Sequence, residues 1–167
     1  MSLHAQAILC SAAEVDPGGR VHMLGAGTEL LPITDAAHTV VVRVRADGND
    51  ASTAHRTALR LLSADGTPVR VARQAQSPGD PASIGLSTVA PVEITGEFPA
   101  IADSPDALPP WGWVSFPLIY AIGPGTLSQP GGYRWEFAAD GRALADAPLY
   151  VLSTEEMAAL QAAQGAQ

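Results

Sequence analysis

Apolar and polar side chains alternate along six stretches of this chain, and no other feature of the sequence constrains the fold as strongly. Successive side chains of a strand point to opposite faces, so alternation with a period of two marks a strand with one buried face. The stretches are 40–46, 58–63, 69–71, 92–98, 114–122 and 134–137. With the shorter runs between them, the pattern predicts about eight or nine short strands.

Turn residues stand between these runs. Asp16-Pro17-Gly18-Gly19, Asp65-Gly66 and Asp140-Gly141 each separate two apolar segments. Asp-Gly and Gly-Gly readily adopt the positive φ angles that tight hairpins need. Short strands joined by such turns predict an all-β fold, namely an antiparallel β-sandwich, immunoglobulin-like or related, or a related barrel.

Three segments interrupt or end the strand pattern. The stretches 76–91 and 99–113 are rich in proline and are predicted to be irregular; loops of this length are often functional or mobile. Ser153-Thr154-Glu155-Glu156 matches a capping box, with Ser153 as N-cap. We therefore expect a sandwich domain over 1–152 and a capped helix or tail over 153–167, which either packs on the domain or frays.

The composition excludes several classes of chemistry. The chain carries nine basic residues, all arginine, against 17 acidic ones, for a net charge of −8. The absence of lysine excludes Schiff-base catalysis, pyridoxal phosphate attachment and a Walker-A loop. The negative balance argues against nucleic-acid binding, and 47% apolar residues with 16% charged ones argue against disorder.

Cys10 is the single cysteine, so neither an intramolecular disulfide nor a cysteine-based zinc site can form. It lies in an apolar run and is predicted to be a small buried residue. The alternative, a lipoprotein acceptor, lacks a basic segment before it and a sufficiently long apolar stretch. No run of 18 apolar residues occurs, so we expect a cytoplasmic protein without membrane contact.

No motif points to an enzyme, a metal or a cofactor. His4, His22, His38 and His55 show no metal-ligand spacing, although His4 and His22 could meet across the first hairpin. The run 47–50 has oxygen ligands like a weak calcium loop, but a turn is the simpler interpretation. Gly25-Ala26-Gly27 is predicted to be a bulge or a close strand approach, since no helix follows it to hold a phosphate.

Two features could serve binding. Trp111 and Trp113 fall on one side of an extended segment, where exposed indoles would favour a protein interface or sugar stacking, and core packing is the alternative. The segment 41–73 holds six arginines and three acidic residues, so it is locally basic within an acidic chain. Arg43 and Arg45 share one strand face, and Arg60 and Arg70 are predicted to point outward, either as a solvated face or as a docking stripe.

The pattern near both ends of the chain also resembles a known family. The segments that carry the resemblance are 7–15, 21–27, 116–122, 129–137, 140–141 and 149–152. They are similar to a family of uncharacterised bacterial proteins, mainly from GC-rich genomes, over most of residues 5–152. The resemblance implies one β-rich domain and brings no activity and no functional residues.

One segment of that pattern has a physical interpretation of its own. In the run 130–137, proline and glycine turn the chain, Tyr133 is expected to anchor the start of a strand, and Trp135 and Phe137 are expected to enter the core. This unit predicts architecture rather than chemistry.

Taken together, these features predict a non-enzymatic accessory or assembly protein. It would act by contact with a protein partner or with another copy of itself, through Arg43, Arg45, Arg60, Arg70, Trp111 and Trp113. The alternative is a sandwich that binds a small ligand or a carbohydrate through the Trp111–Trp113 loop.

Overall fold

The computed structural model of the chain describes residues 3–74, 87–101, 108–109 and 111–165. Within them the fold consists of twelve strands, two short 3-10 segments and one helix at the C-terminal end. The predicted β-sandwich with a short C-terminal helix is confirmed.

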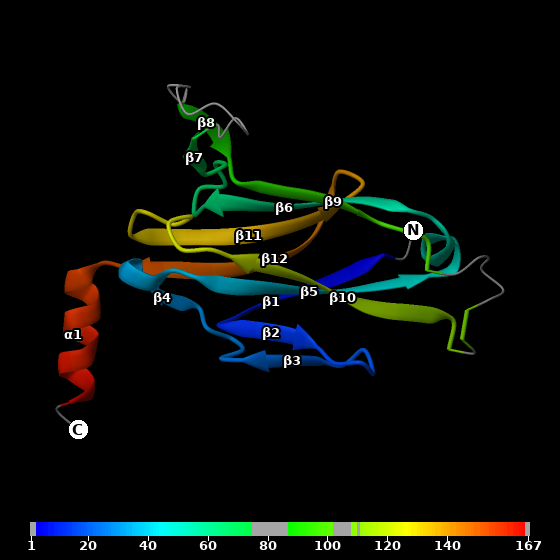
Figure 1. The fold of residues 1–167 in the computed structure, drawn as a ribbon, viewed down its shortest axis with the longest axis horizontal. Coiled ribbons are helices and arrows are strands. Elements are labelled where there is room, and N and C mark those ends of the chain that lie inside the picture. Colours follow the sequence, from blue (N-terminus) through cyan, green and yellow to red (C-terminus); the bar gives the residue numbers. More distant parts are fainter. Residues whose placement is uncertain (1–2, 75–86, 102–107, 110, 166–167) are drawn as a thin grey trace, which may run out of the picture.

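Two sheets form the sandwich, stacked face to face (Figure 1). The three-stranded sheet has the order β1 (His4–Cys10), β5 (His38–Asp47), β10 (Trp113–Ile122), all antiparallel. The five-stranded sheet has the order β4 (Leu30–Pro32), β12 (Arg142–Leu152), β11 (Gly131–Ala139), β6 (His55–Ser63), β9 (Glu93–Phe98). Its pairs are antiparallel except for the short parallel pair of β4 and β12.

Two hairpins extend the sandwich on its opposite sides (Figure 1). β2 (Ala12–Val15) and β3 (Val21–Leu24) lie over the outer side of the three-stranded sheet. β7 (Arg70–Gln74) and β8 (Ser87–Pro91) project from the five-stranded sheet. The 3-10 segments are η1 (Ile33–Asp35) and η2 (Gly48–Ser52).

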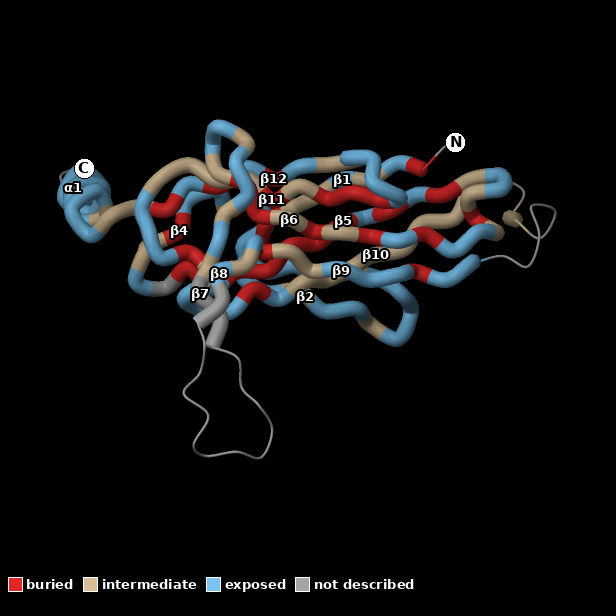
Figure 2. The backbone as a smooth tube through the Cα atoms, turned by 90° about the horizontal axis from the view of Figure 1, so that it is seen from above, coloured by how far each residue is buried: buried red, intermediate tan, exposed pale blue. Residues whose placement is uncertain are grey.

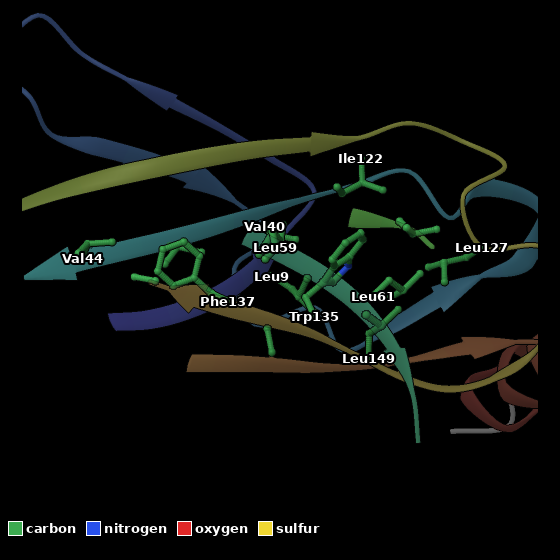
Figure 3. Packing of buried hydrophobic residues seen from close by; sticks show 14 of the residues in the cluster. Leu9, Val40, Val44, Leu59, Leu61, Ile122, Leu127, Trp135, Phe137 and Leu149 are labelled. Carbon is green, nitrogen blue, oxygen red and sulfur yellow. The ribbon is translucent and has the colours of Figure 1, made fainter. Parts of the chain in front are cut away.

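The core lies between the two sheets, as the buried segments in Figure 2 show. Alternation places Val40, Val42 and Val44 of β5 inward, each with 0% exposure. From β11, Trp135 and Phe137 point toward them and fill the centre (Figure 3). The predicted core role of both aromatic side chains is confirmed, and so is the burial of Cys10.

The predicted turns have the expected backbone. Asp140 and Gly141 both have positive φ, 49° and 78°, as a tight hairpin between β11 and β12 requires. The Tyr133 hydroxyl donates to the carbonyl oxygen of Gln129 at 2.9 Å, which anchors the start of β11 as expected. The Asp140-Gly141 turn thus joins β11 to β12, and the Tyr133 bond fixes the start of β11.

Two predictions about irregular and terminal segments need correction or completion. The stretch 76–91 was expected to be irregular, but Ser87–Pro91 forms β8; one valine among small residues carries no alternation to reveal it. α1 (Thr154–Gln164) begins with the predicted capping box, yet it buries no residue and projects from the end of the sandwich (Figure 1). Its residues therefore bury no apolar face against the sandwich.

Candidate functional site

The outer face of the three-stranded sheet carries the two arginines that alternation predicted to point outward. Arg43 and Arg45 are exposed, while the alternating residues Val42 and Val44 are buried. The strand register places Arg45 between His4 and Ser115, and Arg43 between Gln6 and Pro117. Both arginines therefore lie on the middle strand, with neighbours on each side.

The two predicted tryptophans join this face at the start of β10. The guanidinium carbon of Arg45 lies 4.7 Å from the ring centroid of Trp113, which is a cation–π contact. The Trp111 ring is 6.4 Å from that of Trp113, tilted by 59°, and 63% of Trp111 is exposed. We call Arg43, Arg45, Trp111 and Trp113 the Arg–Trp cluster.

The two guanidinium groups of this cluster have neighbouring contacts but no carboxylate partner among the described side chains. Arg43 Nε donates to the Ser115 hydroxyl at 3.0 Å. Among the side chains that the structure describes, no carboxylate lies within ion-pair distance of Arg43 or Arg45. Asp47 follows on the same face of β5, opposite Trp113, and is the single acidic residue of these three strands. Positive charge thus prevails beside exposed aromatic surface.

Arg60 and Arg70 do not join the cluster. Arg60 lies on β6, in the other sheet, where its Nε donates to Glu93 at 2.6 Å. The hydrogen bond and charge of Glu93 raise the pKa of Arg60. Arg70 begins β7, in the separate hairpin. The arginines that the sequence grouped together therefore lie on three different sheets, and Arg60 belongs to a surface of compensated charges.

That compensated surface is the outer face of the five-stranded sheet. A shallow depression of about 400 Å³ there brings together Arg56, Arg60, Glu93 and Glu97. The register pairs Arg56 with Glu97 and Arg60 with Glu93, so charges of opposite sign face each other. Such a face is typical of a solvated sheet surface.

Two histidines are structural. His38 Nδ1–H donates to the Ala36 carbonyl oxygen at 2.7 Å, and its Nε2 accepts the indole N–H of Trp135 at 2.7 Å. An acceptor role at Nε2 requires the neutral imidazole, and burial lowers the pKa of His38 accordingly. Isolated histidines in this sequence gave no signal for such a role, because Trp135 is 97 residues away.

His55 is also buried, but its ring is protonated, whereas that of His38 is neutral. Its Nδ1 contacts Asp140 Oδ2 at 2.6 Å and its Nε2 contacts the Asp50 carbonyl oxygen at 2.8 Å. Burial lowers the pKa of His55, but the hydrogen bonds to Asp140 and Asp50 outweigh burial and raise it. Two acceptors need two N–H donors, so this ring is protonated and ties β6 to the β11–β12 turn.

The remaining candidates do not meet. His4 lies opposite Arg45 on β1, whereas His22 pairs with Glu14 in the β2–β3 hairpin and contacts Asp16 at 3.3 Å. The run 47–50 contains the last residue of β5 and the first three residues of η2. Across the described ranges, no three His, Cys, Asp or Glu side chains converge as metal ligands would.

Sequence reasoning missed a groove beneath the β2–β3 hairpin. It has a volume of about 390 Å³ and is lined by Ile8, Val41, Arg43 and Pro117 from the sheet and by Val21 and Met23 from the hairpin. We call it the hairpin groove. Because its walls come from four strands of the chain and the sheet register joins them, no local pattern could have revealed it.

No helix in the described part of the chain has the length and apolar character needed to cross a bilayer. The longest, α1, has 11 residues, fewer than the roughly 20 that a bilayer requires.

Comparison with known proteins identifies one family. No curated protein matches the chain. The model of a family of unknown function, DUF6941, matches residues 5–152, from the start of β1 to the end of β12. The match includes the Arg–Trp cluster and the hairpin groove and ends before α1. The chain therefore belongs to the family of unknown function DUF6941.

Proposed function

We propose that this chain is a non-enzymatic binding protein that recognises an acidic segment of a protein partner through the Arg–Trp cluster. The observation that carries the proposal is the stacking of Arg45 on Trp113 beside the exposed ring of Trp111. Tryptophan and arginine dominate the binding energy of protein interfaces, since both combine a large contact area with directed polar groups. Here both residue types lie together on an open sheet face.

The charges of the cluster indicate the chemistry of the partner. Arg45 uses one ring face of Trp113 and keeps its N–H groups for an incoming carboxylate. Arg43 donates one N–H to the Ser115 hydroxyl, and this bond holds its guanidinium in place. A preorganised arginine loses less entropy when it binds, so an acidic partner gains from both side chains. Asp47, at the edge of the cluster, would disfavour carboxylates placed beyond Arg45.

The experiment is titration with a short glutamate-rich peptide, followed by the fluorescence of the exposed tryptophan. The variant Arg45→Glu should abolish binding, and Arg142→Glu, an exposed arginine at the start of β12, is the matched control for charge. Binding should weaken between about 50 and 300 mM salt because screening shortens the range of charge attraction. Equal binding by the two variants, or none by the wild-type protein, would refute an acidic partner at this cluster.

A carbohydrate ligand is the second candidate, because Trp111 presents an open ring and sugars stack on such rings. The covered face of Trp113 leaves a smaller platform, which favours the protein partner. A glycan array distinguishes them. A sugar site would be lost in Trp111→Ala, retained in Arg45→Glu and insensitive to salt.

A further inference from the structure

The hairpin groove differs from the rest of the outer sheet face in having two apolar walls. Ile8, Val41 and Pro117 form its floor, and Val21 and Met23 form the opposite wall. Its volume of about 390 Å³ falls within the range of about 300–1,000 Å³ that small-molecule sites occupy. The groove can therefore take an apolar body the size of a short acyl chain.

The turn of the hairpin sets the position of this second wall. Gly19 has a φ of +77°, which lets the chain reverse directly above the sheet. The Asp16 side chain accepts backbone N–H groups of Gly18 and Arg20, both at 2.9 Å. These bonds fix the hairpin tip, so the groove is preformed rather than dependent on a ligand.

Among the described residues that line the groove, one cationic side chain is left without a compensating charge. Arg20 lines one end, but its Nε lies 2.8 Å from Asp16 Oδ2. Hydrogen bonds from the Arg20 backbone, His22 and the Arg20 side chain lower the pKa of Asp16 to about 2, so this carboxylate stays ionised and offsets Arg20. None of the described residues that line the groove is acidic, which leaves the charge of Arg43.

Arg43 and Ser115 can act together on an anion. The Ser115 oxygen accepts from Arg43 Nε, so the Ser115 proton is free to point outward. The two Nη groups of Arg43 and this hydroxyl then present donors toward the groove. A carboxylate can accept from an arginine fork and from a hydroxyl at once.

We propose that the hairpin groove binds a small amphipathic carboxylate, with its apolar chain between Ile8, Val41 and Met23 and its carboxylate at Arg43 and Ser115. This site is separate from the contact proposed above for the Arg–Trp cluster, although Arg43 borders both. Arg45 and the tryptophans lie outside the groove, and Met23 lies outside the cluster. The two proposals can consequently be tested apart.

The test is a titration of the full chain with octanoate, monitored by ¹H–¹⁵N correlation spectra. Octyltrimethylammonium carries the same chain with a cationic head, and acetate carries the head without the chain. Saturable shifts confined to the groove residues are expected with octanoate and not with the other two probes. Equal effects of octanoate and octyltrimethylammonium, or shifts that do not saturate, would overturn the proposal.

Variants of the groove residues test which side chains bind octanoate. Arg43→Gln should weaken octanoate binding by about fivefold or more, the loss expected for a charge-assisted hydrogen bond. Met23→Gln keeps a side chain of similar length and is tolerated because Met23 is 37% exposed. This variant should weaken octanoate binding by about threefold or more. Arg142→Gln, at an exposed arginine outside the groove, is the control. Equal binding by Arg43→Gln and Arg142→Gln would overturn the proposal.

Discussion

The indole N–H of Trp135 donates to Nε2 of His38 at 2.7 Å, across the interior of the sandwich. Trp135 is 0% exposed and His38 is 3% exposed, so water cannot replace either partner. The bond joins β11 of one sheet to the first residue of β5 in the other. A buried polar pair of this kind holds the two sheets in one relative position, because any shift would leave both groups unsatisfied.

Replacing His38 tests that relationship. In His38→Leu the indole N–H of Trp135 remains buried without an acceptor, and the free energy of unfolding should fall by about 1–3 kcal/mol. Urea denaturation followed by tryptophan fluorescence measures the loss. In a double-mutant cycle with Trp135→Phe, the combined loss should be smaller than the sum, since either change breaks the same bond. Strictly additive losses would contradict a direct energetic coupling.

The pH dependence of stability follows from the two buried histidines, which act in opposite directions. The pKa of His38 lies below its ordinary value of 6.5 because of burial. As the pH falls below 6.5, the unfolded chain binds a proton that the folded chain refuses, so His38 lowers stability in acid. The pKa of His55 lies above 6.5, so its contribution is complete below pH 6.5 and is lost as the pH rises through the folded pKa.

His55→Gln isolates the second effect. Near pH 6 the variant should be less stable than the wild-type protein by about 2 kcal/mol, because Asp140 loses a charged partner. The difference should narrow as the pH rises above the folded pKa of His55, where the wild-type ring also loses its proton. Thermal melts between pH 5 and pH 9 provide the comparison. A difference that stays constant across this range would show that His55 is not protonated in the fold.

Asp140 should show the complementary behaviour in acid. The hydrogen bond from His55 lowers the pKa of Asp140, so its contribution is present above the ordinary value of 3.8 and is lost as the pH falls through the folded pKa. Asp140→Asn keeps a residue that tolerates the φ of 49° at this turn. The free energy of unfolding of Asp140→Asn should therefore be lower than that of the wild-type protein at neutral pH. The two values should converge below the folded pKa of Asp140.

The C-terminal helix offers a test of local stability. Ser153 Oγ accepts the Glu156 backbone N–H at 3.1 Å, and Glu156 accepts the Ser153 backbone N–H at 2.8 Å. Ser153→Ala should cost the helix about 1 kcal/mol. Because α1 buries no residue, hydrogen exchange should speed up within α1 while the unfolding midpoint of the sandwich stays unchanged. A lower midpoint would mean that α1 supports the sandwich.

Sequence alternation was sufficient for the strands that line the core. It placed Val40, Val42 and Val44 on one face of β5 and Trp135 and Phe137 on one face of β11, because burial on a single face imprints a period of two. Asp140-Gly141 and the 153–156 capping box were readable because each depends on local backbone chemistry. These features need no knowledge of how the sheets pair.

Features that depend on sheet pairing were not predictable in the same way. Arg43, Arg45 and Arg60 look alike in sequence, since each alternates with apolar residues. The pairing of β6 with β9 gives Arg60 a carboxylate partner, whereas β5 lies between two strands without acidic residues. The hairpin groove arises because the chain folds back after β1. Tertiary packing, and not local propensity, determines this reversal.

β10 is an edge strand of the described sheet, and its central proline is predicted to keep that edge unpaired. β10 pairs with β5 on both sides of Pro117, through Phe116 with Val44 and Leu118 with Val42. Proline lacks an N–H and is found in sheets where that missing donor faces a free edge. Over ten largely apolar residues, Pro117 thus interrupts an edge that could otherwise accept a strand of another chain.

Pro117→Thr restores a donor to the free edge of β10 and should increase self-association relative to the wild-type protein, because continuous edge pairing becomes possible. Sedimentation velocity over a hundredfold concentration range measures the effect. Adding Ile119→Lys to Pro117→Thr is the control, since a charged residue next on the same face opposes pairing and should restore the wild-type profile. If Pro117→Thr sediments as the wild-type protein does at every concentration, the N–H missing at Pro117 does not limit pairing at this edge, and the prediction is wrong.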